Sequence, residues 1–179
     1  MRVAVRSEKA LEHYVQTQME KYKVGRFRKD NARAVVANFI TFVPQNGRLT
    51  IRKILDRLCG RTLGPKLKDH EREARTYLMQ NMVFFSKGKK YHVKRKPPSD
   101  YLINMGFART LIAFDTRVKN VFEQLFGIKV TEQNYEPIED CFLTQIYSKL
   151  RVTPSEFDRI IFQHYDEIRT WGLPRNPPG

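Results

Sequence analysis

The sequence predicts a compact, all-α, multi-helix domain, with a small β-hairpin near 82–95 as one of two interpretations of that segment. Apolar residues recur at helical spacing (i, i+3, i+4, i+7) over several segments. Most glycines and prolines fall at the ends of those segments, where helices stop or start. With 179 residues, 41% of them hydrophobic, the chain is long enough to bury a sizeable core.

The first half of the chain is expected to be helical between well-marked breaks. Helical spacing of apolar residues predicts helices over 7–22, 31–43, 51–59 and 69–82. The breaks are the basic connector "KVGRFRKD" at 23–30, the turn "PQNG" at 44–47 and the loop that begins at Gly60.

The segment "MVFFSKGKKYHVKRK" (82–96) allows two interpretations. The "KGKK" sequence is either the tip of a β-hairpin or a basic loop between two helices. The segment contains no acidic residue and six basic ones: Lys87, Lys89, Lys90, Lys94, Arg95 and Lys96. Either way, positive charge collects here, and Phe84 or Phe85 is expected to belong to the core.

Prolines mark the start of the next helix. Pro97 and Pro98 suit a first helical turn, so a helix is expected over 97–105, ended by Gly106. Lys96 should stand just outside it, because a residue before proline is disfavoured in the α region. The apolar residues 107–114 read as a short buried segment.

The C-terminal helices carry clear capping signals. Asp115 is expected to cap a helix that ends at Gly127. A further helix is predicted over 135–150, and "TPSE" at 153–156 is a capping box that opens the last one, on whose apolar stripe His164 is expected to pack. The expected organisation is a basic N-terminal helix and connector (1–30), a helical domain (31–170) and an extended tail (171–179).

Charge is distributed unevenly along the chain. The net charge is +14, with +17 in residues 1–130 and −4 in residues 131–170. Such asymmetry favours a surface that meets a polyanion, foremost nucleic acid. The two cysteines, Cys59 and Cys141, lie far apart in the sequence, and both are expected to be buried free thiols. Because they form no CxxC pair, a zinc site is not indicated. No apolar run approaches the roughly 18 residues that span a bilayer.

Lys96 and Asp115 each have an ordinary and a functional interpretation. Lys96 is either a solvated lysine or an amine nucleophile, which requires a share of the neutral amine. Asp115 is either a plain helix cap or a rigid carboxylate that stabilises positive charge in a transition state. Spacing alone favours the ordinary interpretation of both residues.

The stretch "KPPSDYLINMGFARTLIAFDTRV" resembles the signature region of the helix-hairpin-helix (HhH-GPD) DNA glycosylase superfamily, and it is most similar to the 8-oxoguanine DNA glycosylase/AP lyase branch. In that family a lysine opens the second hairpin helix, an "S-x-(F/Y)-L-x-N-x-G" segment follows, and an aspartate stands about nineteen residues after the lysine. The matching residues are Lys96, Ser99, Tyr101, Leu102, Asn104, Gly106, Asp115, Thr116, Arg117 and Val118. Residues 135–165 resemble the family's C-terminal helix pair, including its "(S/T)-P-x-E-x-D" turn, so that the similarity covers roughly 95–168.

The resemblance implies excision of an oxidised purine, foremost 8-oxoguanine, from duplex DNA. The damaged nucleotide is flipped out, Lys96 attacks its C1′ to form a Schiff base, and Asp115 stabilises the developing positive charge. It implies no metal and no organic cofactor, damaged double-stranded DNA as partner, and a monomeric intracellular protein that does not enter a membrane. The residues expected to contact DNA are Lys87, Lys89, Lys90, Lys94, Arg95, Ser99 and Arg117, with Gln45 or Asn46 filling the gap left by the flipped base.

The residues just before Lys96 depart from the family's hairpin sequence. The family's hairpin reads "(L/V)-x-G-(I/V)-G-x-K", whereas "YHVKRK" has no glycine, so Lys94 and Arg95 are expected to replace backbone amides as phosphate contacts.

The alternative function is a non-catalytic DNA- or RNA-binding module. In it, residues 31–96 form a winged-helix-like half, "RLTIRKILDRL" enters a groove and "FFSKGKKYHV" is the wing.

Overall fold

The computed structural model describes residues 7–42 and 67–170. Its elements, in chain order, are α1 (Glu8–Lys21), α2 (Arg28–Phe42), α4 (Leu67–Asn81), β1 (Val83–Ser86), β2 (Lys89–His92), α5 (Lys96–Asn104), α6 (Thr116–Phe126), α7 (Tyr135–Cys141), the π-helical segment η1 (Phe142–Tyr147), α8 (Ser148–Leu150) and α9 (Pro154–Ile168). The prediction of a mostly helical protein with a small hairpin is confirmed. The helix expected over 51–59, the tail 171–179, and Gln45 and Asn46 lie outside the described residues.

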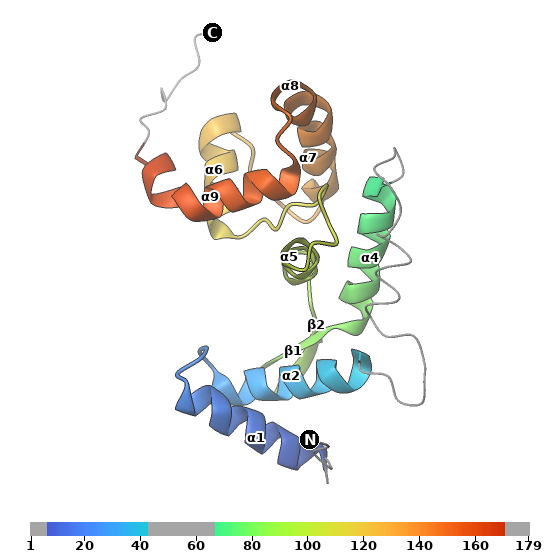
Figure 1. The fold of residues 1–179 in the computed structure, drawn as a ribbon, viewed down its shortest axis with the longest axis vertical. Helices are drawn as coiled ribbons and strands as arrows, with labels where there is room; N and C mark the ends of the chain where they lie inside the picture. Colours follow the sequence, from blue (N-terminus) through green and yellow to red (C-terminus); the bar gives the residue numbers. More distant parts are fainter. Residues whose placement is uncertain (1–6, 43–66, 171–179) are drawn as a thin grey trace.

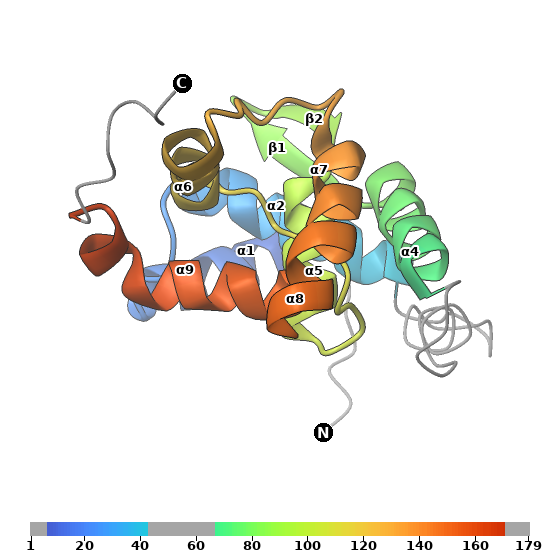
Figure 2. The same ribbon diagram turned by 90° about the horizontal axis from the view of Figure 1, so that it is seen from above.

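The elements form two groups joined by α5 (Figure 1). At one end α1 packs on α2, and α2 packs on β1. At the other end α6, α7, η1 and α9 enclose an apolar cluster centred on Phe114, Phe122 and Phe142. A second cluster, around Leu78, Leu102 and Leu111, joins α4 to α5 and to the segment that follows it. Figure 2 shows α5 lying between α4 and α9. None of the described helices is long and apolar enough to cross a membrane.

The structure resolves the ambiguity at 82–96 in favour of the hairpin. β1 and β2 are antiparallel, with Val83 opposite His92 and Ser86 opposite Lys89. At the tip, Lys87 and Gly88 both have positive φ, 49° and 77°, as the tightest hairpin turns require. The hairpin is fixed to α2 by Asn38, whose side chain donates to the Val83 carbonyl and accepts from its amide, both at 2.9 Å.

The predicted helix ends are largely confirmed. Asp115 Oδ1 accepts the Val118 amide at 2.9 Å, and Gly127 ends α6 in the left-handed conformation with φ 64°. Thr153 and Glu156 form the reciprocal capping box of α9. Lys96 differs by one position, because it is the first residue of α5 rather than the residue before it. The boundary expected at 30 falls inside the first turn of α2.

Some predicted apolar positions are not in the core. Of the stripe expected on α2, Val36 is buried, but Val35, Phe39 and Ile40 are exposed. The reason is that α2 meets β1 partly through the polar side chain of Asn38 rather than through a continuous apolar face. The helix predicted over 135–150 forms with a π-helical insertion, and Cys141 at its centre is exposed, not buried as expected.

Residues between α5 and α6 form a buried, non-helical segment, as predicted for 107–114. Gly106, with φ 75°, ends α5, and Leu111, Ile112, Ala113 and Phe114 are all buried. A non-helical segment inside a protein needs partners for its backbone amides and carbonyls, because an unpaired buried polar group costs about 1–3 kcal/mol. Side chains from α4 and α7 supply those partners.

Glu71 of α4 pairs with the beginning of this segment. Its carboxylate is buried and accepts the Arg109 and Thr110 amides, each at 2.8 Å, and also the Thr110 hydroxyl. Burial raises the pKa of Glu71, and these hydrogen bonds oppose the rise by favouring the charged form. A single side chain thus replaces the helical or strand partners that these amides lack.

Glu139 and Tyr135 of α7 pair with the end of the segment. Glu139 Oε1 accepts the Ile112 amide at 3.1 Å, and the Tyr135 hydroxyl donates to the Ile112 carbonyl at 2.8 Å. The same hydroxyl accepts the Phe114 amide at 3.3 Å. Phe114 precedes Asp115, so this network fixes where α6 begins relative to α5.

Candidate functional site

Lys96 lies at the start of α5 with its amine in an ion pair. Its Nζ is 2.7 Å from Asp100 Oδ2, one helical turn further along, and both side chains are 41% exposed. The pair is therefore reachable from solvent. The ion pair with Asp100 must open before this side chain could act as a nucleophile, because only a neutral amine attacks a carbon atom.

Asp115 lies at the start of α6 and is held rigidly as the helix cap. One of its oxygens, Oδ1, accepts the Val118 amide. The other oxygen makes no hydrogen bond within the described residues. The cap therefore leaves one carboxylate oxygen free to face a substrate.

Asp158, on α9, joins these residues into one cluster. Its Oδ1 is buried and has no hydrogen-bond partner among the described residues. Burial, with the negative charges of Asp100 and Asp115, raises the pKa of Asp158 to about 7, while a hydrogen bond from the Ala113 backbone and the positive charge of Lys96 oppose the rise. α9 packs against α6, and Arg159 Nη2 donates to the Ile103 carbonyl of α5 at 3.3 Å, so the charges at the starts of α5 and α6 act on a side chain of α9.

The sequence contained a signal for Asp158 that was not assigned a role. Asp158 is the last residue of the "(S/T)-P-x-E-x-D" turn that carries part of the family resemblance. Thr153 and Glu156 of that turn serve the helix cap, whereas Asp158 lies one turn inside the helix on the side facing α5 and α6. Only the packing of α9 distinguishes these two roles.

The other residues on or near α5 and α6 that the resemblance implies as DNA contacts differ in their exposure and in their partners. Lys94 is exposed next to α5, whereas Arg95 is engaged with Glu132 at 3.0 Å and Glu136 at 3.7 Å. Arg117 is exposed and lies over the Phe162 ring at 4.9 Å. Ser99 is fully buried, so we leave it out of the proposed interface.

The lysines of the hairpin lie apart from this cluster. Lys87, Lys89 and Lys90 are exposed at or beside the hairpin tip. The tip contacts the N-terminal end of α2, where the Gly88 amide donates to Asp30 Oδ1 at 3.3 Å. These three lysines therefore belong to the α1–α2 end of the molecule.

The aromatic residues of the hairpin are only partly buried. Phe84 and Tyr91 are both exposed and stack on one another, with ring centroids 5.3 Å apart. Phe85 is covered by the Arg33 guanidinium at 4.5 Å. Neither Phe84, which is exposed, nor Phe85, which is half-buried, belongs to the apolar core, so the expectation that one of them does is wrong.

His164 is placed differently from the prediction, and no metal site is evident in the described part of the chain. His164 was expected to pack on the apolar stripe of the last helix, but its side chain is 51% exposed, 3.4 Å from Glu167. A backbone kink at this residue turns it away from the core. Within residues 7–42 and 67–170, no group of three or more His, Cys, Asp or Glu side chains is arranged to hold a metal ion.

The residues before α5 differ from the expected helix-hairpin-helix motif. The resemblance implies a first helix and a turn immediately before the lysine, but β1 and β2 occupy that position. Comparison with protein-family models, curated proteins and solved structures gives no match. Function must therefore be argued from the cluster itself.

Proposed function

We propose that the protein is a DNA glycosylase with AP lyase activity, excising an oxidised purine such as 8-oxoguanine from duplex DNA. The observation that carries the proposal is the packing of α9 against α5 and α6, which brings Asp158 within range of the charges of Lys96, Asp100 and Asp115. An accessible amine beside fixed carboxylates suits attack on a sugar carbon that develops positive charge. The net charge of +17 over residues 1–130 supports a polyanionic substrate.

Lys96 and Asp115 have different roles in the proposed reaction. The neutral amine of Lys96 forms a bond to C1′ of the flipped nucleotide, and the C1′–N bond to the base breaks, with the base leaving as it takes up a proton. Opening of the sugar gives a protonated imine, and loss of a C2′ proton expels the 3′ phosphate. Water then hydrolyses the imine and frees Lys96. Asp115 stabilises the positive charge that develops on the sugar.

Asp158 supplies the proton acceptor that Lys96 needs. A carboxylate with a pKa of about 7 is half ionised at neutral pH, the range in which general bases work best. Its unpartnered Oδ1 can receive a proton without breaking a hydrogen bond within the described residues. Asp100 would keep the Lys96 side chain in place throughout.

Borohydride trapping tests the proposal directly. The protein is incubated with duplex DNA containing 8-oxoguanine opposite cytosine, or an abasic site, and then reduced. We expect a covalent adduct with the wild type and with Lys94→Gln, a matched loss of charge two residues away, but none with Lys96→Gln. An adduct that persists in Lys96→Gln would refute the assignment of the nucleophile.

Two substitutions separate the charge of Asp115 from its role as a cap. Asp115→Asn keeps an oxygen that can accept the Val118 amide, so we expect thermal stability to change by less than about 1 kcal/mol while base excision slows about 100-fold. Asp115→Ala should lose about 1 kcal/mol more, because the cap is lost as well. Single-turnover excision and thermal melts measure the two effects. Excision at the wild-type rate by Asp115→Asn would show that Asp115 acts only as a helix cap.

A non-catalytic nucleic-acid-binding module is the second candidate. The observation that favours it is the hairpin, which packs on α2 as a wing would and carries exposed lysines at its tip. The helix expected to enter a groove, within 48–58, lies outside the described residues. Tight, salt-sensitive duplex binding without any trapped adduct would favour this function.

A further inference from the structure

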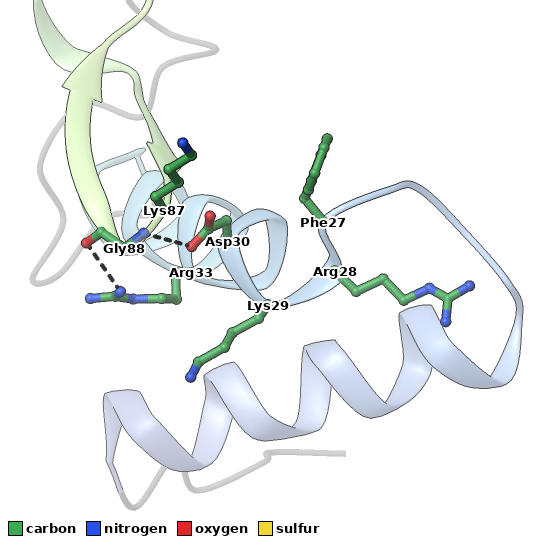
Figure 3. A pocket seen from close by; sticks show the side chains of 7 residues that line it. All are labelled: Phe27, Arg28, Lys29, Asp30, Arg33, Lys87 and Gly88. Carbon is green, nitrogen blue, oxygen red and sulfur yellow. Dashed lines mark hydrogen bonds between the residues drawn. The ribbon is translucent and has the colours of Figure 1, made fainter.

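A hollow lies at the α1–α2 end of the molecule, away from the Lys96 cluster. Its volume is about 520 Å³, and Phe27, Arg28, Lys29, Asp30, Arg33, Lys87 and Gly88 line it. We call it the basic corner. It brings the connector between α1 and α2 together with the hairpin tip, two segments about sixty residues apart in sequence (Figure 3).

Within the described part of the chain, no carboxylate pairs with three of the four cations in the basic corner. Asp30 is the one acid that lines the hollow, and its Oδ1 accepts the Gly88 amide. Arg33 is the fourth cation: its Nε lies 3.9 Å from Glu12 Oε1, and its side chain is also held by the Gly88 carbonyl at 3.4 Å and by the Phe85 ring. Arg28, Lys29 and Lys87 form no ion pair or hydrogen bond with other described residues, so they can neutralise an external anion.

Phe27 adds an exposed aromatic ring in an unfavourable backbone conformation. The residue is 82% exposed, and its φ of 54° lies in the left-handed region, which large side chains avoid. Exposure and backbone strain both cost free energy, and such features gather at binding sites. Figure 3 shows the Phe27 ring and the Lys87 side chain extending toward the same side of α2.

The combination of ring, cations and concavity fits one kind of ligand. A nucleic-acid base stacks on an aromatic ring while its flanking phosphates bind lysine and arginine, a pattern typical of single-strand binding. Bases in a duplex are stacked on one another and do not offer their faces. A membrane surface is flat and would be met by a broad apolar face, whereas the basic corner is hollow and has one ring.

We propose that the basic corner binds single-stranded nucleic acid, with one unpaired base stacked on Phe27 and the neighbouring phosphates held by Lys87 and Arg28. The proposal does not depend on catalysis at Lys96. It gives the protein a second, sequence-tolerant contact with DNA or RNA.

Two substitutions remove the contacts without disturbing the backbone. Phe27→Gly removes the ring at a left-handed position, where glycine is favoured. Lys87→Asn removes the charge at another left-handed position, and Asn-Gly is the preferred sequence for this type of turn. Both variants should therefore melt at or above the wild-type temperature. Matched controls are Tyr14→Ala, which removes another exposed ring from α1, and Lys149→Gln, which removes a charge on α8.

Fluorescence anisotropy with labelled, undamaged 12-mers of dT and of U at rising salt measures binding. We expect Phe27→Gly to weaken binding about 5- to 100-fold. Lys87→Asn should weaken it a few-fold and lower the slope of log K against log salt by about 0.7. The two controls should stay within about twofold of the wild type. Loss for either oligonucleotide supports the proposal.

Two results would overturn the proposal. One is unchanged oligonucleotide binding by both Phe27→Gly and Lys87→Asn. The other is a loss confined to vesicles of phosphatidylcholine and phosphatidylserine, which would make the partner a membrane. Because the oligonucleotides carry no lesion, failure of the trapping experiment at Lys96 leaves this test unaffected.

Discussion

Replacing Arg75 by Met should cost the protein roughly 3–5 kcal/mol of unfolding free energy, the largest effect we expect from a single substitution. Arg75 Nη1 lies 2.7 Å from Glu139 Oε1, and their side chains are 1% and 0% exposed. Met fills a similar space but leaves the buried Glu139 carboxylate with only the longer contact to Arg72 Nη2, at 3.4 Å, and the Ile112 amide. For a chain of this length the loss corresponds to a fall in Tm of roughly 6–20 °C.

The pH dependence of the loss identifies its cause. Burial already raises the pKa of Glu139, and the positive charge of Arg75 opposes that rise. Without Arg75, only the longer contact with Arg72 and the Ile112 amide oppose the rise in pKa, so Glu139 takes up a proton more readily, and this costs less at pH 5 than at pH 8. We therefore expect Arg75→Met to lose more stability at pH 8.

Urea unfolding followed by circular dichroism measures the effect, with two comparisons. The double variant Arg75→Met/Glu139→Gln should recover much of the loss, because no charge is left buried. Lys68→Gln breaks a pair with Asp140 whose side chains are 38% and 39% exposed, so it should cost less than about 1 kcal/mol. A loss below 1 kcal/mol for Arg75→Met would show that Glu139 does not depend on this partner.

Replacing Asp158 by Asn should stabilise the protein at alkaline pH and slow its chemistry. The pKa of Asp158 is about 7 in the folded chain against 3.8 ordinarily. Between about pH 4 and pH 7 the folded state holds a proton that the unfolded state has released, so stability falls as pH rises through this window. Above pH 7 the cost is complete. Its upper bound is about 4 kcal/mol, and partial exposure of the carboxyl reduces the expected value to roughly 1–3 kcal/mol.

Asparagine is neutral at every pH, so Asp158→Asn should match the wild type at pH 4 and exceed it by that amount at pH 8. Thermal melts across this range measure the difference. A gain that is the same at both pH values would point to packing rather than to charge. A loss at both would contradict the assignment of Asp158 as a group that costs stability when ionised.

The same substitution should reduce adduct formation at Lys96 about 100-fold at neutral pH, because the proton acceptor is gone. Opposite effects on stability and on activity are characteristic of residues retained for function. Unchanged trapping kinetics in Asp158→Asn would remove Asp158 from the mechanism while leaving Lys96 in it.

Much of the fold is determined by local sequence. The caps at Ser7, Asp115 and Thr153 and the left-handed stop at Gly127 are formed by residues within one turn of the helix they end. Local signals of this kind predicted most of the described helices to within a few residues. They fail where the outcome depends on a distant neighbour, as on α2, where the polar contact with β1 leaves Phe39 and Ile40 exposed.

The sequence by itself determined where helices start and stop, which residues carry charge, and that Lys96 and Asp115 begin two successive helices. Only the tertiary structure decided how these starts lie relative to one another, because the segment between them is shaped by Glu71, Tyr135 and Glu139. The tertiary structure also identified Asp158, whose raised pKa depends on burial beside α5 and α6. The physical reason is how far apart in sequence the interacting residues lie. A helix cap is completed by a backbone amide three residues away, whereas a buried carboxylate is defined by charges and amides tens of residues away, brought together only by packing.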